Sequence, residues 1–185
     1  MKQNLPSYQD ILDFWFAEKT KPLWFNSSDE FDQLLCEKYL ETYNTAKASK
    51  LAVWQEDPLG VLALVIILDQ FPLNMFRGQS QSFATEAISR DIAAEAINHG
   101  YDAELTPEQK AFLYMPYMHS ENLTDQEQAL ILFNQEGLEN NLKFAQHHYD
   151  IVKKFGRVPH RNKILGRANT KEELKYLNSD EAFLG

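Results

Sequence analysis

Residues 57–72 read DPLGVLALVIILDQFP, and this stretch decides the fold class. Asp57-Pro58 is a helix start, because aspartate is a favoured N-cap and proline is favoured at the first helical position. The residues that follow are apolar on every side of a helix, with an uninterrupted apolar run over 61–68. A helix that is apolar all round is buried in a core. We therefore expect a central helix over 58–70 that ends before Pro72, because a residue that precedes proline disfavours the α conformation.

Helix signals recur on both sides of this segment, and no stretch shows the pattern of a strand. N-caps or capping boxes are expected at Ser7, Thr106, Thr124 and Thr170, and a helix should begin near Ser28 or Asp29. Further expectations are a polar loop over 73–82, a helix over 83–98, a break or kink at Pro116, and a helix over 138–155. Expected helix ends are followed by Gly100, Gly137 and Gly156. The sequence thus predicts an all-α protein of about eight helices, a stack of antiparallel pairs that forms a single domain of residues 1–185.

The charge balance excludes several classes of partner. The chain of 185 residues has 18 Lys+Arg and 27 Asp+Glu, a net charge of -9. This is the wrong sign for a nucleic-acid or anionic-membrane binder, so neither partner is expected. The charges are uneven: residues 1–150 hold 10 basic and 23 acidic residues, whereas residues 151–185 hold 8 and 4. The apolar run of eight residues is short of the roughly 20 needed to span a bilayer. The start lacks a signal-peptide pattern, and the lone Cys36 fits a reducing compartment, so a cytoplasmic location is expected.

Three polar segments stand where the helical pattern stops: DQFPLNMFRG at 69–78, YMPYMHSE at 114–121 and FGRVPHRNKILGR at 155–167. In this order they resemble the uncharacterised, mainly bacterial family catalogued as domain of unknown function 924. That family has D-Q-F-P-R-N-x-[FY]-R-G, Y-M-P-[FY]-x-H-S-E and F-G-R-[FY]-P-H-R-N-x-x-L-G-R in the same places. Leu73 stands where the family usually has arginine, and Val158 where it usually has an aromatic residue. The resemblance implies a tetratricopeptide-like helical stack and no established activity.

Asp69 is the most informative residue of the first segment. It ends the most apolar helix, where a carboxylate is unfavourable both by burial and by the negative end of the helix dipole. It therefore needs a cationic or multiply hydrogen-bonded partner, and we expect an arginine, with Arg77, Arg157 and Arg161 as candidates. Two interpretations follow: an internal salt bridge that locks the loop to the core, or an aspartate that orients an arginine towards a ligand.

The second and third segments offer binding and acid–base groups. Three arginines, a lysine and a histidine between residues 157 and 167 suit an anion site, or they pair with acidic helices of the same chain. His119 and Glu121 are candidates for general acid–base catalysis, although a lone histidine is more often structural. The candidate ligand-binding residues are Asp69, Gln70, Asn74, Arg77, His119, Arg157, His160, Arg161, Asn162 and Arg167. The groups expected to share one open cleft are Asp69, Arg77, His119, Glu121, Arg157, His160 and Arg161.

Other chemistries fail on spacing. The five histidines show no metal-binding pattern, and no phosphate-binding glycine loop occurs, so neither a metal nor a cofactor is expected. Cys36 has no neighbour that would lower its pKa and is expected to be an inert thiol. Most aromatic residues belong to the core, but Trp24 and Phe25 are expected to line a groove.

Three functions remain open at this point. The first is a binding module for a small anionic ligand or an acidic peptide. The second is a hydrolase-like enzyme in which His119 and Glu121 transfer protons. The third is a scaffold whose polar segments only stabilise turns. An open pocket with Arg and His favours the first two, whereas a closed and mutually satisfied network favours the third.

Overall fold

A computed structural model describes residues 5–180 and 182. Over this range the chain contains helices and no strand, which confirms the predicted all-α class. In chain order the elements are α1 (Tyr8–Trp15), η1 (Lys21–Leu23), α2 (Asp29–Lys47), η2 (Ala52–Glu56), α3 (Pro58–Val65), the π-helix η3 (Ile66–Gln70), α4 (Phe71–Met75), η4 (Ser80–Phe83), α5 (Glu86–Asn98), η5 (Tyr101–Glu104), α6 (Pro107–His119), α7 (Leu123–Phe133), α8 (Glu139–Phe155), η6 (Pro159–Arg161) and α9 (Lys171–Leu177). Because α3, η3 and α4 are contiguous, they count as one helix, and the described chain has eight helices besides the short 3-10 turns.

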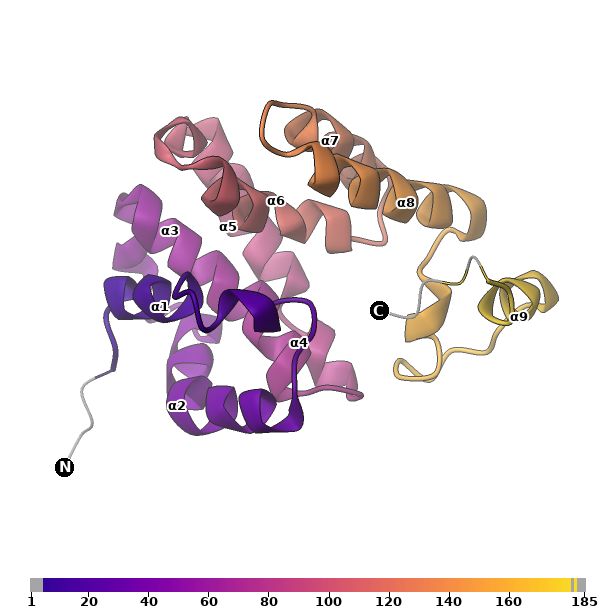
Figure 1. The fold of residues 1–185 in the computed structure, drawn as a ribbon, viewed down its shortest axis with the longest axis horizontal. Helices are drawn as coiled ribbons and strands as arrows, with labels where there is room; N and C mark the ends of the chain where they lie inside the picture. Colours follow the sequence, from indigo (N-terminus) through magenta and orange to yellow (C-terminus); the bar gives the residue numbers. More distant parts are fainter. Residues whose placement is uncertain (1–4, 181, 183–185) are drawn as a thin grey trace.

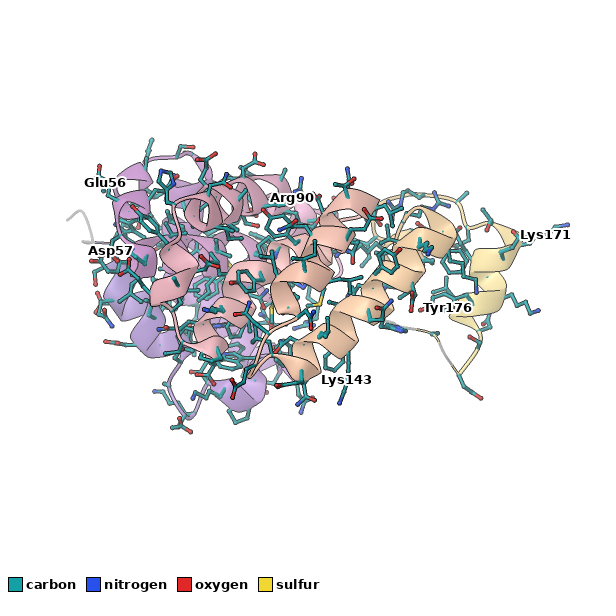
Figure 2. All side chains as sticks on the ribbon, turned by 90° about the horizontal axis from the view of Figure 1, so that it is seen from above. Glu56, Asp57, Arg90, Lys143, Lys171 and Tyr176 are labelled. Carbon is teal, nitrogen blue, oxygen red and sulfur yellow. The ribbon has the colours of Figure 1, made fainter. Side chains whose placement is uncertain are left out.

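The helices pack mainly on their neighbours in the chain. Contacts join α3 to α5, α5 to α6, α6 to α7, and α7 to α8, while α1 and α2 pack on the segment from α3 to α4 (Figure 1). The C-terminal segment with η6 and α9 lies at one end of the molecule (Figure 1). Lys171 and Tyr176 mark this end in Figure 2, and Glu56 and Asp57 lie at the opposite end. The fold is therefore an elongated series of helices that leads from the N-terminal half to α9.

The predicted central helix is the core of the protein. Every residue from 60 to 71 is buried, and Val65 and Ile66 are 0% exposed. Asp57 caps the helix as predicted, because its side chain accepts hydrogen bonds from the amides of residues 59 and 60. Gly60 is required by close packing, since a Cβ there would lie 2.2 Å from the carbonyl oxygen of Trp54. Aromatic rings from α1, α2, α4 and α6 surround this helix.

The predicted end of this helix is wrong, because the helix continues through Pro72 to Met75. The five residues of η3 form a π-helix, in which the amide of Phe71 donates to the carbonyl of Ile66, five residues earlier. In an α-helix the carbonyl of Leu68 would accept from residue 72, and proline has no amide hydrogen to offer. The hydroxyl of Thr85 donates to that carbonyl instead, at 2.5 Å. The wider turn and this side-chain hydrogen bond let proline lie inside a helix.

The continued helix, Pro58–Met75, is longer than the apolar run of eight residues on which the expectation about membrane spans was based. Its 18 residues have a mean hydropathy of 1.6, which makes it long and apolar enough to cross a membrane by length and composition. However, 83% of this stretch is buried inside the protein, as expected of a core helix. No other helix of the described chain meets the same criteria.

Most of the helix caps and terminating glycines predicted from the sequence are present in the structure. The caps at Ser7, Thr106 and Thr170 are confirmed, and so is the helix start near Ser28 or Asp29, since α2 begins at Asp29 with Ser28 as its N-cap. Gly100 and Gly156 adopt the left-handed conformation just past helix ends, as expected. The predicted cap at Thr124 is wrong, since the helix starts at Leu123 and Asn122 caps it.

Predictions at the edges of buried helices also need correction. The helix predicted over 83–98 begins at Glu86, and much of the predicted loop 73–82 belongs to α4 and η4. Helix α6 continues through Pro116, which is itself buried, as far as His119. Tertiary packing of these apolar segments overrides the local preference of proline.

A charge placed in the core tests the position of the central helix. Val65→Asp or Ile66→Asp should lower the free energy of unfolding by about 3 kcal/mol or more, because each would bury an unpaired carboxylate. Val53→Asp is the control: Val53 is 65% exposed, and the same change there should stay within about 0.5 kcal/mol. Urea unfolding measures both. A loss below about 1 kcal/mol at residue 65 would show that the core lies elsewhere.

Candidate functional site

Asp69 and His119 form a buried pair at the junction of η3 and α6. The Asp69 side chain is 0% exposed and accepts a hydrogen bond from Gln70 Nε2 at 2.5 Å. The Nδ1 atom of His119 lies 3.1 Å from Asp69 Oδ1 and 3.0 Å from Oδ2. The prediction that Asp69 pairs with an arginine is therefore wrong. The continued helix directs Asp69 towards the last residue of α6, and the candidate arginines bind other carboxylates.

One ring nitrogen of His119, Nδ1, is hydrogen-bonded to Asp69, and the other has no partner within the described chain. Its side chain is 15% exposed, and its Nε2 atom makes no hydrogen bond within the described chain. Burial by itself would lower the pKa of His119, but the Asp69 carboxylate outweighs this effect and raises the pKa above its ordinary value.

Arg161 lies beside this pair and is bound to Glu86. Its Nη1 atom is 3.0 Å from the Glu86 carboxylate, and its guanidinium lies 4.5 Å from the centroid of the Phe83 ring. Burial raises the pKa of Glu86, and the opposing effects of Arg161 and His119 do not cancel that rise. Arg161 is only 6% exposed and belongs to η6, so this ion pair connects the third polar segment to the start of α5.

Glu121 joins the second and third segments. Its carboxylate receives two hydrogen bonds from Arg167, at 2.6 and 2.8 Å, and one from the Val158 amide at 2.7 Å. Burial would raise the pKa of Glu121, but these donors lower it below its ordinary value. Glu121 is therefore held as a carboxylate by Arg167, and it makes no hydrogen bond to His119 in the described structure.

Arg157 fixes the C-terminal helix. It donates from Nε and Nη2 to the Glu173 carboxylate at 2.6 and 2.8 Å, and from Nη2 to the Ala168 carbonyl. The Glu173 side chain is 2% exposed, and these hydrogen bonds lower its pKa to about 2. Because Glu173 also closes the capping box of Thr170, one carboxylate holds both the arginine and the first turn of α9.

Arg77 lies apart from the other candidates. It donates to Asp32 of α2 at 2.6 Å and to the side-chain oxygen of Asn74 at 2.9 Å. Asn74 in turn donates to the Gln70 carbonyl at 3.4 Å. This network closes the turn after α4 on α2, so Arg77 and Asn74 have a structural contact of their own.

Six charged or titratable residues form what we call the polar junction, and electrostatic interactions connect all of them. They are Asp69, Glu86, His119, Glu121, Arg161 and Arg167. Of the residues expected to share a cleft, the structure thus brings Asp69, His119, Glu121 and Arg161 together. His160 is the neighbour of Arg161 in η6, and the buried Asn162 donates to Asn169. Arg77 lies apart from the junction, and Arg157 binds α9.

The sequence did not indicate the carboxylates that bind three of the arginines. Asp32, Glu86 and Glu173 lie 45, 75 and 16 residues from Arg77, Arg161 and Arg157, respectively. No local spacing connects such residues, and only the charge difference between residues 1–150 and 151–185 was a signal that pairs of this kind exist.

Other chemistry at the junction is limited. Ser120 donates to Asp125 at 2.5 Å and accepts from the Asn122 amide, so its hydroxyl is not directed at His119. Among the described residues, no three His, Cys, Asp or Glu side chains gather in a way that could hold a metal ion. Two surface cavities of about 690 and 640 Å³ lie elsewhere, and none of the predicted site residues lines them.

Comparisons with known proteins find a bacterial family of unknown function and a similar solved structure. The model of a family described as "Bacterial protein of unknown function (DUF924)" matches residues 11–181. A solved structure of a protein of unknown function from Agrobacterium tumefaciens is 37% identical, with a TM-score of 0.88. The match covers 92% of this chain and 96% of that one. No curated protein matches. Neither description mentions a tetratricopeptide-like arrangement, which stays a prediction.

The Asp69–His119 pair predicts that the stability of the folded protein depends on pH. Because the pKa of His119 is raised above its unfolded value near 6.5, its contribution to stability is full below pH 6.5 and is lost as the pH rises through the folded pKa. Asp69→Asn removes the charge and should lower the pKa of His119, which an NMR titration of the ring measures directly. An equal His119 pKa in both proteins would contradict the electrostatic role of Asp69.

Glu173 predicts a pH dependence of stability with the opposite sign. Its pKa is lowered to about 2, so its contribution is full above the unfolded value of 4.5 and is lost as the pH falls towards 2. Glu173→Gln should destabilise α9 at pH 7 by about 1 kcal/mol or more, because it removes a charge-assisted hydrogen bond. Protection of the α9 amides from hydrogen exchange measures this. Glu172→Gln, at the exposed neighbouring residue of the same turn, is the matched control and should have little effect.

Proposed function

This chain belongs to the DUF924 family of bacterial proteins of unknown function, and we propose that it is an enzyme in which the Asp69–His119 pair transfers a proton to or from a small anionic substrate. One observation carries the proposal: a fully buried carboxylate binds Nδ1 of a histidine whose side chain is 15% exposed and whose Nε2 makes no hydrogen bond within the described chain. The pair that the sequence suggested, His119 with Glu121, is replaced by His119 with Asp69.

The pairing prepares His119 for acid–base work in two ways. The Asp69 carboxylate accepts a hydrogen bond from Nδ1–H, so a neutral ring presents Nε2 as the free acceptor. The same carboxylate raises the pKa of the ring above its ordinary value, which makes the imidazole a stronger base. His119 can therefore take a proton from water or a substrate hydroxyl and return it to a leaving group, as a hydrolase-like reaction requires.

The arginines are less available for a ligand than a binding module would require. Arg77, Arg157, Arg161 and Arg167 are each paired with a carboxylate of the chain, which favours the scaffold interpretation for these side chains. Arg161 is the one that also interacts electrostatically with His119. Burial raises the pKa of its partner Glu86, so this carboxylate is neutralised more easily than an ordinary glutamate when an anionic group approaches. On this basis we propose that Arg161 binds the anionic group of the substrate.

Variants of the pair test the proposal against a panel of small carboxylate and phosphate esters. His119→Gln should reduce hydrolysis about 100-fold or more, which is the usual contribution of general acid–base catalysis, and Asp69→Asn should reduce it as well. His99→Gln is the control, since His99 is exposed and bonds only the Glu95 carbonyl. Circular dichroism confirms that each variant is folded. Turnover that is equal in the wild type and His119→Gln would overturn the proposal.

A thermal-shift screen separates binding from catalysis. A ligand at 100 times its Kd adds about 2.7 kcal/mol of stability, so an anionic compound held at the junction raises the melting temperature measurably. A shift that Arg161→Gln abolishes, without any turnover dependent on His119, would replace the enzyme by the binding module. The expected cytoplasmic location, and the absence of nucleic-acid and membrane partners, remain predictions from composition.

A further inference from the structure

We propose that a groove between η1, α6 and the start of α8 binds a linear peptide segment of a partner protein, with one apolar side chain beside lysine or arginine. This groove lies apart from the polar junction and has a volume of about 640 Å³. Its lining includes Trp24 and Phe25, which confirms the prediction that these two residues line a groove. The proposal is independent of the acid–base function.

The floor of the groove is apolar and rigid. It consists of the buried side chains of Ala111, Phe112, Met115 and Leu138. Trp24 forms one wall: its ring lies edge-on to Phe112 with centroids 4.6 Å apart, and its Nε1 donates to the Trp15 carbonyl. A preformed apolar floor beside a fixed indole suits the anchor side chain of a ligand, because little ordering is needed on binding.

Phe25 is the exposed part of this surface. Its ring is parallel to that of Phe112, with centroids 6.5 Å apart, yet the residue is 74% exposed. Phe144 is 59% exposed and lies one helical turn beyond Asn141, a groove residue of α8. The apolar surface therefore extends past the groove along α8, as an extended chain would require.

Asn141 offers a contact for a peptide backbone. Its side-chain amide lines the groove and makes no hydrogen bond with the described part of the chain. An amide that carries both a donor and an acceptor can bind the carbonyl and the N–H of one peptide unit. This polar contact favours a peptide over a purely apolar ligand.

The charge around the groove decides the kind of peptide. Glu108, Glu136 and Glu139 are exposed in or beside its lining. Lys21 is shared between Glu18 and Glu108, at 3.1 and 3.2 Å. The N-termini of α6 and α8 contribute the equivalent of about half a positive charge each, which does not offset the carboxylates. The rim is therefore acidic, and lysine or arginine beside the anchor would complement it.

Selection from a display library of random peptides tests the proposal, followed by fluorescence anisotropy with one synthetic peptide from the enriched set. We expect an apolar residue flanked by lysine or arginine, and an affinity that weakens as salt increases. Phe25→Ser should weaken binding tenfold or more, and Glu108→Gln several-fold. The matched control is Val53→Ser, at an apolar residue that is 65% exposed on η2, and it should leave the affinity unchanged.

Three outcomes would overturn the proposal. One is an enriched sequence that is acidic or lacks an apolar anchor, and another is an affinity that Phe25→Ser leaves intact. The third is a dimer, detected by analytical ultracentrifugation, that Phe25→Ser dissociates, since the groove would then hold a second copy of this chain. Because Phe25 is exposed, the variant is expected to fold, and circular dichroism checks this.

Discussion

Pro72 lies inside the most buried helix of the protein, and the site depends on how the helix accommodates it. A proline has no amide hydrogen for the carbonyl one turn earlier, so the chain widens into a π-helix and Thr85 donates to Leu68. This widened turn carries Asp69 into the interior at the last residue of α6. A buried carboxylate must be compensated, and His119 provides the compensation while its second ring nitrogen makes no hydrogen bond within the described chain. Thus a backbone constraint in the core is connected to the pairing of an imidazole that is only 15% exposed.

The ion pairs around this imidazole explain the uneven charge of the sequence. The basic region after residue 150 supplies Arg161 and Arg167, and the acidic region before it supplies Glu86 and Glu121. Charges that suggested an external anion are therefore largely complementary within the chain. Buried ion pairs of this kind contribute little net stability, because desolvation opposes the attraction, but leaving one partner alone is costly. Their main effect is to fix where η6 and the segment that leads to α9 sit against the helical core.

Local signals predicted much of the fold, and long-range contacts decided what they missed. The capping boxes at Thr106 and Thr170 need only four neighbouring residues, and the glycine at 156 needs only its own backbone freedom. The central helix was predictable because apolar residues on all its faces demand burial. Its true end was not, since the partner of the Leu68 carbonyl is 17 residues away. Likewise, burial showed that Asp69 needs a partner, but nothing within the polar segments could distinguish a histidine 50 residues away from an arginine.

The π-helical turn also has a consequence for how this chain can change in length during evolution. In an α-helix each residue advances the chain by about 100° around the axis, so adding or removing one residue rotates everything beyond it. The turn over Ile66–Gln70 holds one residue more than an α-turn, and the faces of the helix before and after it are offset accordingly. Losing that residue would give a more regular helix but would rotate the buried faces of α3 and α4 relative to each other. Insertions and deletions should therefore be confined to surface turns, while this irregular turn keeps its length.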